Sequence, residues 1–359
     1  MKLLVISLAG IGDALLATPL LHELRLNFPA ATLDAFVMWG GAKDLLEGNP
    51  HLNTVFHKNL IQAGARPALQ FLWTLRRRNY DVSLNTYPQG KIHYRVVSRL
   101  IHARQRLSHR YENHGWKDGW LVNRTVAQDY SRHSVDNNLR FLELLGVEPK
   151  LAEHESELFL TEVERQWAAA FVRDHHLAGK RIVGVHVGSG KTKNLALRRW
   201  PLENYIALIK QLTFTHPDAA VVLFGGPEEK SDHEIILRET RGQSVVETTS
   251  RNLREATALL AHCQAFLSVD TALMHLAAAM KVPRQIVIET PTFNKTIEPH
   301  RRPYVLVRNP MVNGRNLDYY RYDGRDIQGT PQHLVECMKS ITVQDVFTPL
   351  TQAIAGTSG

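Results

Sequence analysis

The sequence has little cysteine and no long uninterrupted apolar run. Cys263 and Cys337 are the only cysteines among 359 residues, and each lies in an apolar, helix-like stretch. Two distant cysteines exclude a disulfide framework and a cysteine metal site, and they fit a reducing cytoplasm. A membrane-spanning helix needs roughly 18 consecutive apolar residues, and no such run occurs. Because glycines, an aspartate and a proline interrupt the apolar first 21 residues, we expect no signal peptide.

Two nucleotide-binding fingerprints are also missing. The segment "GSGKTK" lacks the P-loop spacing, because no glycine stands five residues before Gly190. The segment "AGIGDALL" has Gly10 and Gly12 but Leu15 in place of the third glycine of a dinucleotide motif. These gaps argue against a nucleoside triphosphatase and against a hydride-transfer enzyme.

The histidines show no familiar metal-ligand spacing. His175 and His176 are adjacent and would point to different faces of an element, and His109 and His114 have no acidic companion at a known spacing. We therefore expect no metal site and no cofactor.

What the chain has in excess is positive charge. With 43 Lys and Arg against 35 Asp and Glu, its formal net charge is +8. A basic balance favours acidic partners such as nucleic acid, anionic lipid or phosphorylated substrates, and charge alone does not choose among them.

Apolar segments of strand length alternate with segments of helical spacing through the first half of the chain. We expect strands at 2–8, 32–39, 80–87 and 104–109, and helices at 14–28, 42–46, 68–78, 93–100 and 133–145. Such alternation is typical of a parallel sheet with helices on both faces.

The same rhythm begins again after residue 180. Strands are expected at 181–188, 219–226, 265–270 and 284–290, with helices at 201–217, 254–263 and 271–280. The fold class is therefore α/β, with two Rossmann-like domains facing one another across a cleft. We expect an N-terminal domain at 1–165, a C-terminal domain at 166–330, and a helical segment at 331–359 that packs back on the N-terminal domain.

The stretch "SVDTALMHLAAAM" places polar side chains where a strand gives way to a helix. Asp270 is a candidate N-cap, and the free amides of Thr271, Ala272 and Leu273 suit an anion such as a diphosphate. The alternative is that Asp270 only caps the helix and His275 only packs.

Three further stretches carry candidate site residues. In "HVGSGKTKNLALRRWP", a glycine turn is followed by Ser189, Lys191, Lys193 and Arg198, which suit phosphate oxygens unless this is a solvated basic loop. Asp13 follows the first glycine turn and is either an N-cap or a general base. In "LFGGPEEK", Glu228 and Glu229 follow a strand and fit ribose hydroxyls, or form a surface turn.

Taken in order, these segments resemble the family 9 glycosyltransferases, the ADP-heptose:lipopolysaccharide heptosyltransferase family. The resemblance runs from Met1 to about Tyr304, and its motifs are "GDALLATPLLHELRLNFP", "YDVSLN", "HSVDNNLRFLELLG", "VGVHVGSG", "RRWPLENYIALI", "VVLFGGPEE" and "SVDTALMHLAAAM". It implies a GT-B fold and a transferase that inverts the anomeric centre without a metal.

The resemblance also implies roles for individual residues. Asp13 would be the general base, and the C-terminal domain would bind the nucleotide sugar. The donor-binding set would be Ser189, Lys191, Lys193, Arg198, Glu228, Glu229, Asp270, Thr271, Ala272 and His275. Arg198 stands where the family usually has lysine, and Ala272 where it usually has glycine.

The acceptor side is implied by the same resemblance to be an anionic glycolipid met at the inner face of the cytoplasmic membrane, and not nucleic acid. Basic residues of the first domain fit such a partner. The acceptor-binding set would be Gly12, Arg76, Lys91, Arg95 and Arg110, although the Arg76–Arg78 run also fits a solvated helix face. Trp116 and Trp120 would stack on sugar, insert into the membrane interface, or pack.

The expected function is transfer of heptose from ADP-heptose to a lipopolysaccharide core or a related surface glycan. Two alternatives stay open: the same fold with another nucleotide sugar and a protein or small-molecule acceptor, or a non-catalytic nucleotide-sugar-binding module. Ala272 and Glu289, which adds negative charge near the expected diphosphate, favour the binding module.

Overall fold

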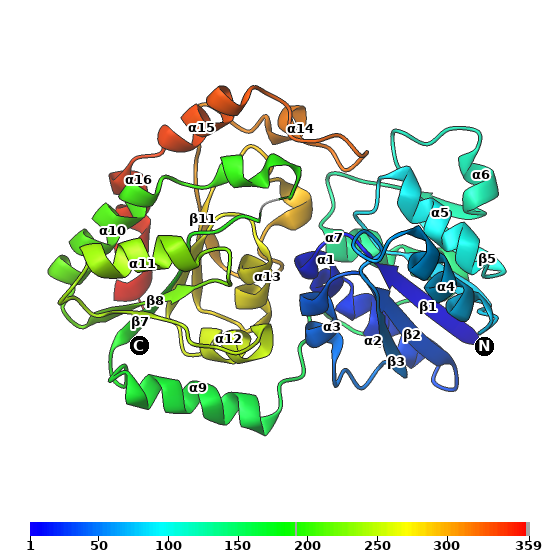
Figure 1. The fold of residues 1–359 in the computed structure, drawn as a ribbon, viewed down its shortest axis with the longest axis horizontal. Coiled ribbons are helices and arrows are strands. Elements are labelled where there is room, and N and C mark those ends of the chain that lie inside the picture. The colour runs from blue at the N-terminus through cyan, green and yellow to red at the C-terminus, as the bar shows by residue number, and fades with distance from the viewer. Residues whose placement is uncertain (191, 357–359) are drawn as a thin grey trace. The chain divides into compact units, whose positions relative to one another are not determined.

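The chain forms two units, each built on a six-stranded parallel sheet (Figure 1). The structure, a computed structural model, describes residues 1–190 and 192–356. The N-terminal unit contains Met1–Phe159 and Arg321–Arg325, and the C-terminal unit contains Leu160–Tyr320 and the residues from Asp326 onward. The expected α/β class with two parallel sheets is confirmed.

The first sheet has the strand order β3-β2-β1-β4-β5-β6. Its strands are β1 (Lys2–Ser7), β2 (Thr32–Val37), β3 (Thr54–His57), β4 (Val82–Asn85), β5 (Gln105–Arg110) and β6 (Arg124–Ala127). The helices of this unit are α1 (Ile11–Leu16), α2 (Thr18–Asn27), α3 (Gly40–Leu46), α4 (Ala65–Arg76), α5 (Ile92–Ile101), α6 (Asp118–Leu121), α7 (Ser134–Leu139) and α8 (Phe141–Leu145).

Both faces of β1 are buried, which explains its continuous apolar sequence. Leu3 and Val5 pack with apolar residues of α2, α3 and α8, whereas Leu4 and Ile6 pack with those of α4 and α5. Successive side chains of a strand point to opposite faces, so one apolar run supports two helical layers.

The second sheet repeats the plan with the order β12-β11-β10-β7-β8-β9. Its strands are β7 (Arg181–His186), β8 (Ala219–Phe224), β9 (Val245–Glu247), β10 (Ala265–Ser268), β11 (Arg284–Ile288) and β12 (Tyr304–Val307). Its helices are α9 (Glu162–Asp174), α10 (Leu202–Thr215), α11 (Lys230–Glu239), α12 (Leu253–Leu260), α13 (Ala272–Ala279), α14 (Asn316–Tyr319), α15 (Pro331–Lys339) and α16 (Val343–Ala355), with 3₁₀ turns η1 (Thr192–Arg198) and η2 (Lys295–Ile297).

The C-terminal helices correct one expectation. Helices α15 and α16 pack within the C-terminal unit and not on the N-terminal domain, because Met338, Val346 and Leu350 belong to the same apolar core as Val185 and Leu267. It is instead the short segment Arg321–Arg325 that joins the N-terminal unit. Arg321 donates to Glu112 there at 2.6 Å.

Buried polar groups fasten the segment that leads out of the N-terminal unit. Glu23 on α2 is fully buried, and its carboxylate accepts hydrogen bonds from the amides of Lys150 and Leu151 and from His154. Burial alone would raise the pKa of Glu23, but these donors lower it below the usual value. The chain after Glu148 is therefore held against α2.

A histidine is buried in the sheet of the N-terminal unit. His109 on β5 is fully buried and Nε2 donates to the Asn137 carbonyl at 2.8 Å. Burial lowers the pKa of His109 to about 4, with the nearby Arg140 charge acting in the same direction.

We expect the free energy of unfolding to fall as pH is lowered from 6.5 toward 4, because His109 then binds a proton in the unfolded chain but not in the native one. Between pH 7 and 5 this linkage amounts to about 2 kcal/mol, and His109→Gln removes it. Urea denaturation at both pH values measures the difference. An unchanged pH slope in the variant would contradict the assignment.

Candidate active site

Strand order reverses once in each sheet, between β1 and β4 and between β10 and β7. In open parallel sheets, ligands bind outside the carboxyl ends of the strands at such a reversal. Asp13 lies just beyond β1, and Ser189 and Asp270 lie just beyond β7 and β10. The structure thus brings the principal candidate residues of each unit to the edge where a ligand is expected.

Asp13 lies in the first turn of α1, and a missing side chain makes room for its carboxylate. Gly10 is the N-cap of α1, in an extended conformation that any residue adopts. A Cβ placed on Gly10 would lie 2.8 Å from Asp13 Oδ2. A glycine is therefore needed at position 10 to leave room for the Asp13 carboxylate, and not for the backbone conformation of the turn. Asp13 itself is not the N-cap.

Two phenols lie near this carboxylate. Burial raises the pKa of Tyr94 to about 12, and the negative charge of Asp13 adds to the shift. Burial also raises the pKa of Tyr111, and the negative charge of Asp13 makes a small further contribution to that rise. The Tyr111 hydroxyl accepts a hydrogen bond from the Gln89 amide at 2.7 Å. Neither tyrosine was expected from the sequence, because α5 and the loop after β5 bring them to Asp13 from about 80 and 100 residues away.

In the C-terminal unit, Asp270 is the centre of a buried polar cluster. Its Oδ2 accepts hydrogen bonds from Arg198 Nη1 at 2.6 Å and from Thr292 Oγ1 at 2.9 Å, and its Oδ1 accepts one from Thr290 Oγ1 at 2.6 Å. Arg198 Nη2 also reaches the Ser189 carbonyl at 3.3 Å. One ion pair thus joins the loops that follow β7, β10 and β11.

The expectation that Asp270 is an N-cap is wrong. Thr271 occupies the N-cap position of α13, and the oxygens of Asp270 are taken by Arg198 and two threonines. Thr271 Oγ1 is buried and has no hydrogen-bond partner among the described residues. Together with the amides of Ala272 and Leu273, which the first turn of a helix leaves unpaired, it offers donors to an anion.

Three other residues that the sequence predicts to bind the donor have structural positions in the C-terminal unit. Ser189 is buried and donates to the Leu195 carbonyl at 2.8 Å, so its hydroxyl holds η1 in place. Arg198 closes the same loop through Asp270. His275 is buried within α13. Lys191 and the side chain of Lys193 lie outside the described residues.

The two glutamates after β8 have different surroundings. Glu229 is buried, and its carboxylate accepts hydrogen bonds from the Gly226 amide at 3.0 Å and from Arg199 at 3.1 Å. A Cβ on Gly188 would collide with Glu229 Oε1, so that glycine makes room for the carboxylate. Glu228 is exposed and takes no part in these bonds.

The expected acceptor residues do not form one exposed set. Gly12 is buried in α1, and Arg95 is buried with its guanidinium held by the Asp118 carboxylate and the Gly90 carbonyl. Lys91 is the half-buried N-cap of α5, Arg76 is half-buried on α4, and Arg110 is exposed at the end of β5. Arg95 therefore presents no free charge to an acceptor.

Glu289 also has a structural role. Its carboxylate is buried and accepts the Asn309 amide at 2.8 Å, with Arg308 at 3.9 Å. The Glu289 carboxylate thus holds the loop after β12. Its negative charge is therefore no reason to prefer a non-catalytic binding module to an enzyme.

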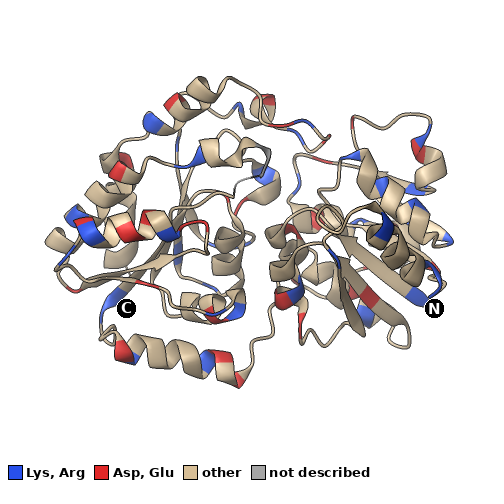
Figure 2. Cartoon of the chain, viewed as in Figure 1, with Lys and Arg blue, Asp and Glu red and all other residues tan. Residues whose placement is uncertain are grey.

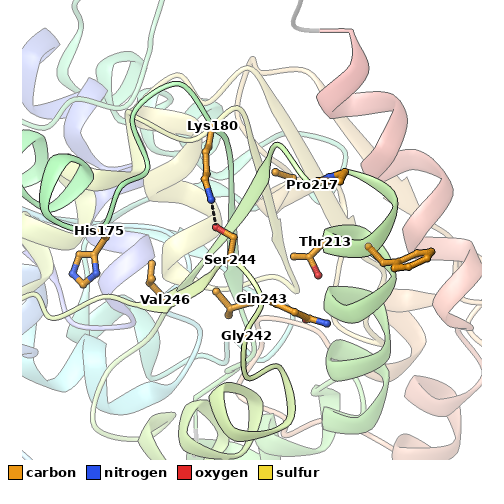
Figure 3. A pocket seen from close by; sticks show the side chains of 11 residues that line it. His175, Lys180, Thr213, Pro217, Gly242, Gln243, Ser244 and Val246 are labelled. Carbon is orange, nitrogen blue, oxygen red and sulfur yellow. Dashed lines mark hydrogen bonds between the residues drawn. The ribbon is translucent and has the colours of Figure 1, made fainter.

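A hollow of about 640 Å³ in the C-terminal unit lies away from these residues (Figure 3). Its lining includes Lys180, Ala219 and Val245, at the amino ends of β7, β8 and β9, and Lys180 Nζ donates to Ser244 Oγ at 2.7 Å. Because ligands of such sheets bind at the carboxyl ends, this hollow is not the candidate site.

One group of metal-ligand types occurs in the described part of the chain, namely His22, His51 and Glu157. Each carboxylate oxygen pairs with one imidazole, at 2.8 and 3.2 Å. The two rings stack with centroids 4.0 Å apart and an angle of 18° between their planes. The group is accounted for by hydrogen bonding.

The two parallel sheets thus place the candidate residues, Asp13 in one unit and the start of α13 in the other, at the reversal of their own strand order. The profile of glycosyltransferase family 9 (heptosyltransferase) matches residues 68–320, and the chain belongs to this family. It is 27% identical over 286 residues to lipopolysaccharide heptosyltransferase 3 of Escherichia coli K12, covering 76% of this chain and 78% of that protein. The family resemblance in the sequence is thereby confirmed.

Solved structures agree on the fold. The E. coli ADP-heptose lipopolysaccharide heptosyltransferase II superposes with a TM-score of 0.71 at 20% identity over 100% of both chains. The E. coli heptosyltransferase WaaC with ADP-2-deoxy-2-fluoro heptose gives a TM-score of 0.69 at 18% identity, covering 98% of this chain and 99% of that one. The fold is that of the GT-B glycosyltransferases.

We expect Arg198→Ala to lower the free energy of unfolding by about 3–5 kcal/mol, because it leaves the Asp270 carboxylate buried without its cation. Adding Asp270→Asn should recover about 2 kcal/mol of that loss, since the two residues are directly coupled. Chemical denaturation of the four proteins of this cycle measures the coupling.

The exposed pair Arg238 and Glu239 is the control, and Arg238→Ala should cost no more than about 0.5 kcal/mol. Additive losses for Arg198 and Asp270 would show that their contact does not hold the loops together.

Proposed function

We propose that this glycosyltransferase moves heptose from ADP-heptose to a lipopolysaccharide core or a related surface glycan, with inversion and without a metal. The names of its relatives support the donor and the acceptor class. The observation that carries the proposal is that each unit has a candidate group at the reversal of its own sheet: the Asp13 carboxylate in the first, and the N-terminus of α13 in the second.

The donor diphosphate is proposed to bind at the N-terminus of α13. The amides of Ala272 and Leu273 and the buried hydroxyl of Thr271 donate to its oxygens, and the helix dipole favours negative charge there. Arg198 adds positive charge at the same edge, although Asp270 balances much of it. Exposed Glu228 is assigned to the ribose hydroxyls, and Asp270, whose oxygens accept from Arg198, Thr290 and Thr292, is assigned to holding the loops of this edge and not to the sugar hydroxyls.

Asp13 is proposed to accept the proton of the acceptor hydroxyl. The acceptor oxygen then attacks the anomeric carbon while the bond from that carbon to the diphosphate breaks, and ADP leaves with the bonding electron pair. The donors at α13 stabilise the charge that develops on the diphosphate, which is where electrostatic stabilisation is most effective. The proton taken by Asp13 balances the charge of the attacking oxygen.

The acceptor is proposed to be an anionic glycolipid bound by the N-terminal unit, with Lys91 and Arg110 as the phosphate-binding candidates. Such a substrate places the enzyme at the inner face of the cytoplasmic membrane. No described helix combines the length and the apolar content that crossing a membrane would require.

The first test compares ADP, UDP, GDP and CDP as stabilisers of the purified protein, without added metal. We expect ADP to raise the melting temperature most, because ligands that bind only the native state stabilise it by mass action. A larger shift with UDP or GDP would overturn the ADP-heptose donor, and no shift with any nucleotide would overturn the donor site.

We expect Asp13→Asn to lower kcat by about 10²- to 10⁴-fold while ADP still stabilises the protein, because a general base is lost and the donor edge is untouched. Transfer from ADP-heptose to a heptose-deficient core glycolipid measures the rate. An active Asp13→Asn enzyme would exclude Asp13 as the base.

Gly10→Ala tests the position of the same carboxylate. Its Cβ would displace Asp13 Oδ2, so we expect kcat to fall by roughly 10- to 100-fold with little change in stability. Gly40→Ala is the matched control, because a Cβ there meets no atom within 4 Å. Equal rates in the two variants would contradict the role of Gly10.

A further inference from the structure

Exposed apolar side chains gather on one part of the N-terminal unit. Of the twelve large apolar side chains that are exposed in the described part of the chain, eight lie between Ile61 and Trp120. Trp73, Trp116 and Trp120 are exposed by 52%, 88% and 66%. Scattered exposed apolar residues are ordinary, but a contiguous patch marks an interaction surface.

The helices of this region are apolar on their outer side as well as their inner side. On α5, Val97 and Ile101 are buried, while Ile92, Val96 and Leu100 form an exposed stripe at intervals of four residues. A surface helix normally turns polar residues to solvent, so the outer stripe of α5 needs a partner.

Contacts connect α4 with α5 and α5 with α6. On α4, Leu69 and Trp73 form a second exposed apolar stripe. Arg76 of α4 donates to the Leu100 carbonyl of α5, and the Arg99 guanidinium of α5 lies 4.4 Å from the Trp120 ring centroid of α6. We call this surface the α4–α6 face, made of Arg66, Leu69, Trp73, Arg76, Arg77, Ile92, Val96, Arg99, Leu100, Trp116, Lys117 and Trp120.

Lys and Arg also occur along this part of the N-terminal unit (Figure 2). Arg76 and Arg77 lie over the Trp73 ring, and Lys117 lies over Trp116. Between residues 61 and 110 the chain has ten Lys and Arg but a single acidic residue, Asp81. The acid of α6, Asp118, is buried and paired with Arg95, so it does not offset this charge at the surface.

We propose that the α4–α6 face binds the surface of an anionic lipid bilayer. Tryptophan is the side chain best suited to the boundary between headgroups and acyl chains, and Arg and Lys beside it pair with lipid phosphates. An apolar stripe flanked by cations is the pattern of a protein that lies on a membrane without spanning it. Binding of the α4–α6 face to lipid does not depend on the proposed function. Only the purpose of that binding, which is to bring the enzyme to a lipid-linked acceptor, rests on the proposed function.

The test is sedimentation of the full-length protein with vesicles of phosphatidylethanolamine and phosphatidylglycerol, and with vesicles of phosphatidylcholine. We expect binding to the anionic vesicles that weakens with salt, and a loss of at least about tenfold in Trp116→Ser/Trp120→Ser. Charge reversal in Arg66→Glu/Arg77→Glu should cause a similar loss.

Matched controls lie on the C-terminal unit. Phe214→Ser removes an aromatic side chain that is 87% exposed, and Arg173→Glu/Arg241→Glu makes the same change in net charge. Both controls should bind vesicles like the wild type. Equal losses in the controls, or unchanged binding in the α4–α6 variants, would overturn the proposal.

Two further measurements distinguish a lipid-binding face from a protein-binding face and from the site of transfer. A dimer in sedimentation velocity that dissociates in Trp116→Ser/Trp120→Ser would assign the face to a second copy of the chain and overturn the lipid assignment. Transfer to a water-soluble acceptor fragment should be unchanged in the same variant. Vesicle binding without any transfer would refute the proposed function and leave the surface intact.

Discussion

The reversal of strand order within each parallel sheet is the constraint on which the rest of the structure depends. At a reversal, the connections from neighbouring strands leave toward opposite faces, so a space opens at the carboxyl edge. In the first sheet α1 begins at this space and carries Asp13, and in the second α13 begins there and presents Thr271. The same architectural feature thus positions the proposed proton acceptor in one unit and the proposed diphosphate site in the other.

The positions of the carboxylates at each edge depend on nearby glycines and on buried hydrogen bonds. Gly10 and Gly188 lack side chains where the carboxylates of Asp13 and Glu229 lie. Asp270 connects the loops that follow β7, β10 and β11 through its hydrogen bonds and is not a helix cap. Catalytic edges need such supports because a misplacement of about 1 Å is costly in rate.

The sequence predicted the strong elements well and the weak ones poorly. The apolar runs of β1, β7, β8 and β10 and the helix α13 were predicted close to their observed places, because these elements are almost wholly buried and their sequences are nearly continuous in apolar residues. The edge strands β3, β6, β9 and β12 were missed, since each has three or four residues and partial exposure. The N-cap at Asp270 was wrong because its real partners, Thr290 and Thr292, lie about 20 residues later, where no local signal points to them. The prediction for the packing of α16 was wrong for a similar reason. The sequence of an amphipathic helix shows which face is apolar but not which core that face packs against.

The proposed binding of the donor diphosphate at the N-terminus of α13 is tested most directly by hydrogen exchange with and without ADP. We predict slower exchange of the amides from Thr271 to Met274 when ADP binds, because the nucleotide covers the unpaired amides of that turn. Exchange at Gly10 to Leu16 should not change. Protection confined to another region, such as the hollow at residues 242–246, would contradict a donor site at α13.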